Sequence, residues 1–232
     1  MITALAVEKA LKKHGSSAKA KASAWFFKTG KEQYGYGDVF IGVTVPEQRK
    51  IAKHFKDLPL PEIKKLLVSK YHECRLTALI ILVAQFNDGS EKTREKLAKF
   101  YLANAKRVNN WDLVDSSAPY ILGQYLLHKD RKVLYKLAKS KNLWERRIAI
   151  LSTFWFIREG EFKDALAIGE LLLSDTHDLM HKATGWMLRE VGKRSRPTLV
   201  RFLNTHKATM PRTALRYAIE HFSTKKKGEF MT

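Results

Sequence analysis

Apolar residues recur along most of this chain at the three- and four-residue spacing of an amphipathic helix, and this periodicity constrains the fold more than any other feature. The stretch at 34–45 (YGYGDVFIGVTV) instead has the glycine, aromatic and β-branched content of extended chain. No second strand lies nearby to pair with it, so we interpret it as a structured loop that leads into a helix. The sequence therefore predicts an all-α protein. Three stripes carry the helical pattern: Leu76, Leu79, Ile80 and Val83; Val114, Ala118, Ile121, Leu122 and Tyr125; and Ala183, Met187, Leu188 and Val191.

A weak internal repeat accompanies the helices. The segments HECRLTALI from His72, WERRIAILS from Trp144 and LMHKATGWM from Leu179 align so that each has a basic residue at its fourth position. WDLVDSSAP, from Trp111, fits the frame without the basic residue, and successive starts lie 39, 33 and 35 positions apart. Periods of this length predict an α-solenoid of stacked HEAT-like antiparallel helix pairs, which forms a curved, basic concave groove. The three basic residues are Arg75, Arg147 and Lys182.

No linker long enough to split this array is visible. We therefore expect a single HEAT-like domain at residues 1–224, followed by a basic, flexible tail at 225–232 (KKKGEFMT).

The charge of the chain points to a polyanionic partner. Lys and Arg number 43 against 23 Asp and Glu, which gives a net charge of +20 in 232 residues. Such a charge favours nucleic acid, whose binding would weaken steeply with salt, although excess lysine can also serve solubility alone. A membrane surface is disfavoured because the basic residues are spread along the chain, and no apolar run of about 18 residues exists.

Metal and disulfide chemistry find little support. One cysteine, Cys74, excludes an internal disulfide and a multi-cysteine zinc site, and its place in an apolar helix indicates a core residue. His177 and His181 have the spacing of a zinc-protease helix, but Asp178 stands where that motif needs glutamate and no third ligand is evident. We expect no metal and no cofactor.

The N-terminal stretch carries Glu8 within its apolar residues and no cleavage signal, which argues against secretion. We expect a cytoplasmic protein, associated with the nucleoid if the source is prokaryotic. We also expect a monomer without an obligate protein partner.

The segment Asn109–Asp115 (NNWDLVD) is the most informative cluster. Trp111 and Asp115 lie four residues apart and so share one helix face, and Asp115 adjoins the apolar stripe that begins at Val114. A carboxylate at the edge of a core is costly unless its charge is stabilised or used. Two interpretations stay open: a catalytic carboxylate, or a structural helix start in which an asparagine caps, Trp111 packs and Asp115 forms a salt bridge.

A second tryptophan lies between cations. Lys182, Trp186 and Arg189 form a stripe beside the core stripe of the same helix. This arrangement suits a wall that meets the sugar and phosphate of DNA, but Trp186 could equally cover the aliphatic stems of its neighbours. Arg147, at the matching position of the preceding repeat, belongs to the same series of cations by the alignment above.

Several motifs together resemble the alkylpurine DNA glycosylases of the AlkD family. FIGVTVPEQRKIAK at 40–53, which contains Arg49, is similar to that family's first inner helix and the loop before it. The likeness covers most of the chain in the right order and is weaker before Val39 and after Arg212. The other matching motifs are NWDLVDSSAPYILGQYL at 110–126, NLWERRIAIL at 142–151 and HKATGWMLREVGK at 181–193.

The resemblance implies excision of cationic alkylated purines, such as 3-methyladenine and 7-methylguanine, from double-stranded DNA to leave an abasic site. It implies that Asp115 is the catalytic carboxylate, that Trp111 and Trp186 are active-site tryptophans and that Arg147 holds the DNA backbone. It further implies engagement of the lesion from the sugar-phosphate side, without a base-reading pocket. No lysine occupies a nucleophile-like position near Asp115, so we expect no strand cleavage. With Arg147, we predict three more DNA-binding residues: Lys182, Arg189 and Arg49.

These residue types suit the chemistry. Alkylation puts a positive charge on the purine, so the base leaves neutral and the demanding step is the formation of an oxocarbenium-like sugar. A carboxylate near C1′ stabilises that cation and orients water, and each indole face adds roughly 0.5–2 kcal/mol.

Two other classes of HEAT-like protein are alternatives to a glycosylase. A non-catalytic HEAT-like module that binds DNA or structured RNA is disfavoured by the presence of Asp115, Trp111 and Trp186. A protein-binding HEAT scaffold is disfavoured by the charge of +20. Two departures from the family pattern bear on lesion preference: Asn109 and Asn110 stand where a bulky residue is common, and the YGYG segment at 34–37 is unfamiliar.

Overall fold

The computed structural model describes residues 2–231, and its regular elements are all helices, which confirms the all-α prediction. Within this range β-structure is limited to one isolated parallel bridge between Val39 and Tyr71. Val39 belongs to the segment at 34–45 that we interpret as a loop. None of the helices in the described range has the length and apolar content to cross a membrane. The chain divides into two compact units, one ending at Ser117 and the other beginning at Ala118.

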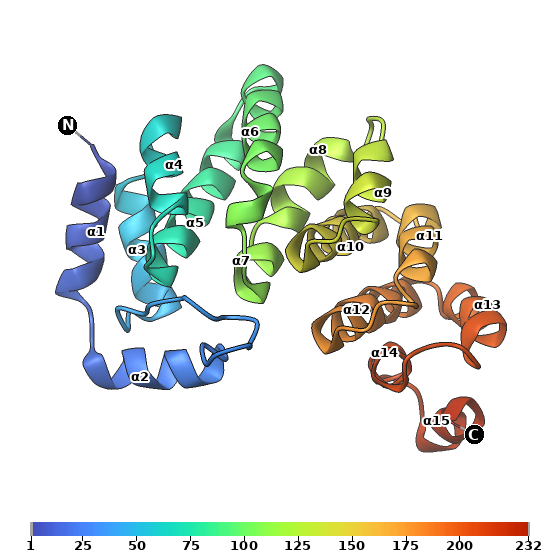
Figure 1. Ribbon diagram of the computed structural model, residues 1–232. Coiled ribbons are helices and arrows are strands. Elements are labelled where there is room, and N and C mark those ends of the chain that lie inside the picture. The colour runs from blue at the N-terminus through green and yellow to red at the C-terminus, as the bar shows by residue number, and fades with distance from the viewer. Residues whose placement is uncertain (1, 232) are drawn as a thin grey trace. The chain divides into compact units, whose positions relative to one another are not determined.

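The first unit is built around α5 (His72–Asp88), which packs against α3, α4, α6 and α7 (Figure 1). Because neighbours surround it, eight consecutive residues from His72 to Leu79 are buried. The one-sided stripe predicted here was therefore wrong in part: Leu76 and Leu79 are buried, but Ile81 and Leu82 are buried more deeply than Ile80 and Val83. The other elements of the unit are α1 (Ala4–Lys13), α2 (Ser17–Phe26), α3 (Val45–His54), α4 (Leu60–Leu67), α6 (Glu91–Ala103), η1 (Ala105–Arg107) and α7 (Trp111–Asp115).

The second unit places α10 (Leu143–Arg158) against η2, α9, α11 and α12, and α12 (Asp178–Arg194) against α13 and α14. On α12 the predicted stripe is confirmed, since Ala183, Met187, Leu188 and Val191 are all buried. The remaining elements are η2 (Pro119–Gly123), α8 (Gln124–Leu126), α9 (Lys132–Ala138), α11 (Lys163–Leu171), α13 (Arg196–His206), α14 (Arg212–Ala218) and α15 (Thr224–Met231).

The stripe predicted from Val114 to Tyr125 is buried except for Tyr125, which is half-buried, but the helix that carries it is interrupted by two serines and a proline. The Ser116 hydroxyl donates to the Asp112 carbonyl and the Ser117 hydroxyl to the Leu113 carbonyl, both at 2.6 Å. Pro119 has no N–H with which to continue the α-helical ladder, and the chain goes on as the π-helical turn η2. As a result α7 is only five residues long.

Four helices begin at or next to the predicted starts of the internal repeat. Two begin at the predicted residue, and the other two begin one residue earlier. The helices α5, α7, α10 and α12 begin at His72, Trp111, Leu143 and Asp178. In the fourth position of α5, Arg75 donates from Nη1 to the Ser69 carbonyl six residues earlier, at 2.9 Å.

Contacts elsewhere show which residues correspond to Arg75. Arg146 donates to the Ser140 carbonyl at 3.1 Å, and Nε2 of His181 lies 2.5 Å from the Asp175 carbonyl. Each partner again lies six residues earlier in the chain. The residue that corresponds to Arg75 is therefore Arg146, and Arg147 and Lys182 lie one position further along their helices.

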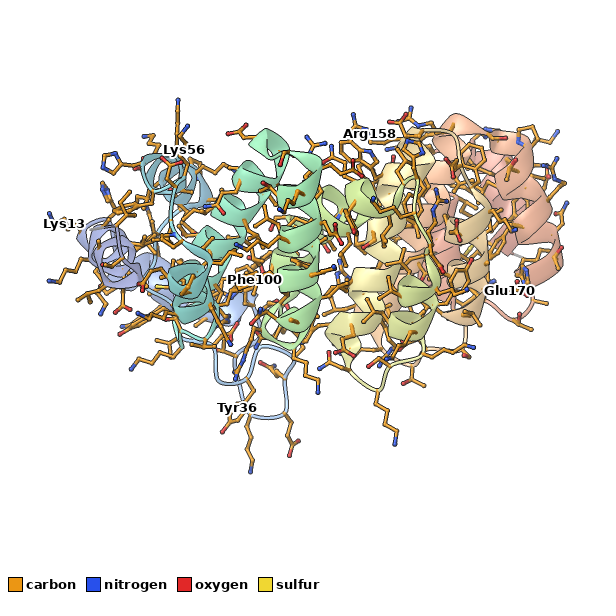
Figure 2. The ribbon with its side chains drawn as sticks, turned by 90° about the horizontal axis from the view of Figure 1, so that it is seen from above. Lys13, Tyr36, Lys56, Phe100, Arg158 and Glu170 are labelled. Atoms are coloured by element: carbon orange, nitrogen blue, oxygen red, sulfur yellow. The ribbon has the colours of Figure 1, made fainter. Side chains whose placement is uncertain are left out.

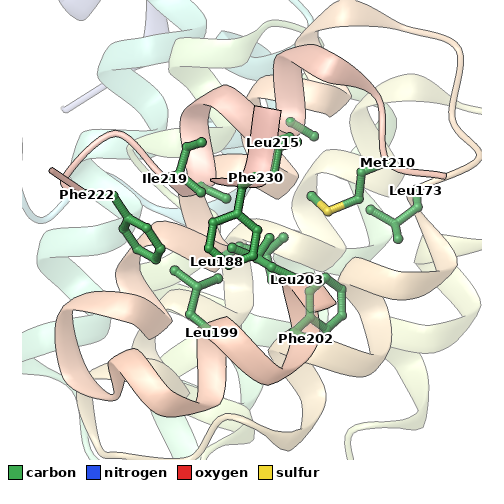
Figure 3. Packing of buried hydrophobic residues seen from close by; sticks show 12 residues of the cluster. Leu173, Leu188, Leu199, Phe202, Leu203, Met210, Leu215, Ile219, Phe222 and Phe230 are labelled. Carbon is green, nitrogen blue, oxygen red and sulfur yellow. The ribbon is translucent and has the colours of Figure 1, made fainter. Parts of the chain in front are cut away.

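The C-terminal segment differs from the flexible tail predicted at 225–232, of which Thr232 lies outside the described residues. Thr224–Met231 forms α15, and its Phe230 is only 4% exposed. Figure 3 shows Phe230 among Leu188, Leu199 and Leu203 in the core of the second unit. Burial of the Phe230 ring anchors this polar, basic helix, and the partly buried Met231 packs against the same core.

Gly185 permits the close approach of α12 and α14. A Cβ at this position would lie 2.4 Å from the Ala214 carbonyl oxygen and 2.6 Å from Cβ of Tyr217. We expect Gly185→Ala to lower the free energy of unfolding by about 1–3 kcal/mol, measured by urea denaturation. The control is Gly228→Ala in α15, where a Cβ would have no neighbour within 4 Å. There the gain in helix propensity should leave stability unchanged or slightly higher, and equal losses for both variants would contradict the packing argument.

Candidate active site

The short helix α7 carries both residues of the first unit that were predicted to be catalytic. Asn110 is its N-cap, and the side-chain oxygen accepts a hydrogen bond from the Trp111 backbone N–H at 2.8 Å. Trp111 opens the helix and Asp115 ends it, and both are half-buried. The capping part of the structural interpretation is therefore confirmed, and it accompanies the catalytic interpretation rather than replacing it.

The Trp111 ring belongs to an aromatic cluster formed with residues at the end of α2 and in the following loop. Its plane is stacked on Phe27, with ring centroids 5.3 Å apart and an interplanar angle of 16°. Phe26 meets it edge-on at 5.9 Å. Phe27 is stacked in turn on Phe40 at 5.1 Å. The orientation of this indole is therefore set by segments far from α7 in the sequence.

Asp115 lies at the border of the core of the first unit. The hydroxyl of buried Tyr101 and the Ser117 hydroxyl are 2.9 Å apart. Burial raises the pKa of Tyr101, and the negative charge of Asp115 adds to this rise. Asp115 is therefore close enough to act electrostatically on the buried Tyr101 hydroxyl, as expected of a carboxylate at the edge of a core.

A group of buried polar side chains, here called the His72 network, lies behind the aromatic cluster. Nδ1 of His72 is 3.0 Å from Oδ2 of Asp38, and Nε2 is 2.7 Å from Oδ2 of Asp112. Arg75 donates to Oδ1 of Asp38 at 2.5 Å. Asn110 donates to Oδ2 of Asp38 at 3.1 Å. These five side chains join the loop before α3, the start of α5 and the start of α7.

Hydrogen bonds and opposite charges shift the pKa values of His72 and Asp38 in this network. Burial disfavours a charged His72, but its hydrogen bonds to Asp112 and Asp38 outweigh burial, and its pKa is raised above the ordinary value of 6.5. Burial likewise disfavours the Asp38 carboxylate, but the hydrogen bond from His72 and the charge of Arg75 keep its pKa below the ordinary value. Two cations thus face two carboxylates in the interior.

Glu73, next to His72, holds the loop before α3 by binding the backbone of that loop. Its carboxylate accepts hydrogen bonds from the N–H groups of Ile41 at 3.0 Å, Gly42 at 2.7 Å and Val43 at 3.3 Å. Gly42 has φ of +86°, which favours glycine, and its Cα lies against the start of α2. At the outer edge of the loop Tyr36 is exposed (Figure 2).

In the second unit, Arg147 is buried rather than displayed at the surface. It is 5% exposed, and Nη1 donates to the Leu179 carbonyl at 2.7 Å. The bond ties α10 to the first turn of α12. Trp186 lies further along the same helix. Arg146 beside it forms a salt bridge with Asp175, with Nε 2.6 Å from Oδ2.

The predicted cation stripe of α12 is present, and its members face carboxylates. Trp186 is half-buried and donates from Nε1 to Oε1 of Glu190 at 3.1 Å. Nζ of Lys182 lies 2.7 Å from Asp178, and Arg189 pairs with Glu220. A phosphate group would compete with these carboxylates for the two cations.

The other residues considered in the sequence have structural or surface positions. Arg49 is exposed on α3 in the first unit. Cys74 is buried in α5, as predicted. His177 caps α12, its side chain accepting from the Leu179 N–H at 3.1 Å. Among the described residues, no cluster of three or more His, Cys, Asp and Glu side chains is arranged to hold a metal ion.

Sequence reasoning missed the partners of Trp111. In the sequence His72 stands out only as the start of a repeat segment, and nothing marks Asp112, Asp38 or Phe27 as its partners. One signal was available: His72, Glu73 and Arg75 are three ionisable residues at the start of an otherwise apolar helix. Buried charges of this kind need partners, which have to come from other segments.

Together, these features define an all-helical protein whose first unit holds an indole and a carboxylate on one short, firmly anchored helix. The chain belongs to the DNA alkylation repair enzyme family, whose model matches residues 7–222. No curated protein matches the chain. A solved structure described as a predicted DNA alkylation repair enzyme from Enterococcus faecalis is 16% identical, with a TM-score of 0.71, over 91% of this chain and 98% of that one. At this identity the likeness shows a shared fold.

Proposed function

We propose that this protein is a monofunctional DNA glycosylase that hydrolyses the N-glycosidic bond of cationic alkylated purines, 3-methyladenine and 7-methylguanine among them. One observation carries the proposal: in a chain of the DNA alkylation repair enzyme family, Trp111 and Asp115 lie half-buried on one five-residue helix whose start is anchored by buried polar contacts. A half-buried carboxylate beside an aromatic face suits the stabilisation of a cationic sugar.

In the proposed reaction the purine leaves with both electrons of the C1′–N bond, which cancels its positive charge. The sugar becomes oxocarbenium-like, and its charge is stabilised by the Asp115 carboxylate and the face of Trp111. Water oriented by Asp115 then adds to C1′ through its oxygen and releases one proton to the solvent, which leaves a hydroxyl on the sugar. The products are the free base and an abasic site.

Residues of the second unit complete the proposal. Trp186 supplies the second indole, and Arg147 binds the DNA backbone. Lys182, Arg189 and Arg49 bind further phosphates of double-stranded DNA, a partner supported by the family and by the charge of +20. A HEAT-like solenoid with a basic concave groove belongs to the same proposal.

The direct test is release of bases from methylated genomic DNA, followed by chromatography of the free bases. We expect 7-methylguanine and 3-methyladenine to appear, with abasic sites left in uncut strands. Tight, salt-sensitive DNA binding without any base release would instead favour a non-catalytic module that binds nucleic acid.

Arg147→Ala tests the proposed backbone contact. Loss of one phosphate contact should weaken DNA binding and reduce the slope of log Kd against log salt by about one unit. The matched control is Arg146→Ala, which removes the same charge from a guanidinium paired with Asp175. Both variants should lose stability, because Arg147 is buried and also holds the Leu179 carbonyl, but Arg146→Ala should keep the wild-type slope. Identical slopes in all three proteins would remove Arg147 from the phosphate-binding residues.

A further inference from the structure

The helix that carries Trp111 and Asp115 is too short to hold itself in place. A five-residue α7 contains about one turn, and isolated helices below roughly 12 residues are unstable in water. The positions of both side chains therefore depend on contacts that α7 makes with other segments. The charged contacts among these are made by the His72 network.

We propose that His72 is a positioning residue: as an imidazolium that bridges Asp38 and Asp112, it fixes the start of α7 and the orientation of the Trp111 indole. The role of that indole in base excision rests on the proposed function. The positioning itself concerns only contacts within the first unit.

The backbone of α7 is held on both sides of Trp111. On one side, Asn110 caps the helix and donates to Asp38 at 3.1 Å. On the other side, Asp112 accepts from His72 at 2.7 Å. Since His72 also binds Asp38, one buried ring connects the two anchors. Of these two polar anchors, removing the ring would leave the one made by Asn110.

The same ring supports the indole. Phe27 lies between them, with its centroid 4.8 Å from the His72 ring and 5.3 Å from the Trp111 ring. Phe40 is stacked on the His72 ring, with centroids 4.7 Å apart, and also on Phe27. Displacement of His72 would therefore loosen the stack that orients Trp111.

The bridge requires both ring protons. The charged groups that face His72 are Asp38 from the loop, Asp112 from α7 and Arg75 from its own helix. Both carboxylates accept, so a neutral imidazole can serve only one of them. Because the pKa of His72 is raised in the folded protein, the bridge is complete at and below pH 6.5 and is lost as the pH rises through the raised pKa.

Nuclear magnetic resonance of the indole N–H groups tests the positioning without any assay of activity. The Trp111 signal is assigned by its absence in Trp111→Phe, and wild type and His72→Gln are compared between about pH 6 and pH 10. We expect one titration of the Trp111 signal in wild type, and a shifted or broadened, pH-independent signal in the variant. Trp155, in the second unit, is the control whose signal should not change.

A Trp111 signal that is the same in wild type and His72→Gln at every pH would overturn the proposal. If His72→Gln fails to fold, Asp112→Asn removes the charged acceptor of the same bond and is judged by the same signal. The titration of wild type needs no variant, and a Trp111 signal that stays constant over the range would also overturn the proposal.

Single-turnover base release gives the second readout. We expect His72→Gln to lower the rate by about 10- to 100-fold, as for other small misplacements of reacting groups, with Kd for DNA unchanged within about two-fold. The wild-type rate should also fall at high pH, and this fall should be absent in the variant. Ile81→Val, in the same helix, controls for lost stability and should keep the wild-type rate and pH profile.

The two proposals fail in different ways. Absence of base release from wild type would refute the glycosylase, while the Trp111 signal would still decide the role of His72. Base release by His72→Gln at the wild-type rate and with the wild-type pH profile would refute the positioning role and leave the glycosylase intact.

Discussion

Asp115→Asn is expected to lower the rate of base release about a thousand-fold or more while leaving DNA affinity nearly intact. The amide keeps the size of the carboxylate and removes its charge, which in the proposed reaction stabilises the cationic sugar. Loss of one preorganised electrostatic partner in a partly dry site costs about a hundred- to a thousand-fold, and a full charge lies at the upper end, about 4 kcal/mol. The measurement is single-turnover release of 7-methylguanine from methylated DNA.

The matched control is Asp88→Asn, which removes one negative charge from an exposed position at the end of α5. Both substitutions should strengthen DNA binding slightly, because both make the protein more basic. Only Asp115→Asn should lose the reaction. Equal rates in Asp115→Asn and wild type would show that a group other than Asp115 stabilises the cationic sugar.

The helices were predictable because their information is local. Spacing in the sequence identifies a helix and its most apolar face, as the buried stripe of α12 shows. It does not tell how many neighbours a helix has. α5 is buried nearly all round because helices pack against several of its sides, and no periodicity within α5 contains that information.

The repeat shows a second limit. Its period was visible, but its register depends on which residue begins each helix, and sequence similarity alone placed two starts one residue late. Hydrogen bonds settle the register, since Arg75, Arg146 and His181 each reach the carbonyl six residues earlier. In α15, burial of the single aromatic Phe230 outweighed a composition typical of a solvated tail.

For the candidate site, the pairing of Trp111 with Asp115 followed from helical spacing. Their supports did not, because Asp38 and Asp112 meet His72 across separations of 34 and 40 residues. The two departures noted in the sequence, Asn110 and the YGYG segment, turn out to be connected. Asp38 directly follows YGYG and accepts from Asn110, so the unfamiliar loop serves to anchor the helix.

The largest loss of stability is expected for Glu73→Ala. Glu73 is 2% exposed, and its carboxylate accepts from three successive backbone N–H groups, those of Ile41, Gly42 and Val43. Alanine would leave these donors buried without an acceptor at about 1–3 kcal/mol each, partly relieved by relaxation of the loop. We expect the free energy of unfolding to fall by about 3–5 kcal/mol in urea denaturation.

Two variants separate the causes. Glu73→Gln keeps one acceptor oxygen but turns an amide NH₂ toward the same donors, so about half of the loss should remain. Glu62→Ala removes a carboxylate that accepts from one backbone N–H, that of Ala4 at 2.8 Å, and should cost about 1 kcal/mol.

Glu73→Ala should also reduce base release beyond its effect on the folded fraction, because the loop that it holds carries Asp38 and Phe40 to the His72 network. A loss of stability with an unchanged rate per folded molecule would mean that the loop keeps these contacts without Glu73. In that case Arg75, which also binds Asp38, would be the residue that fixes the loop.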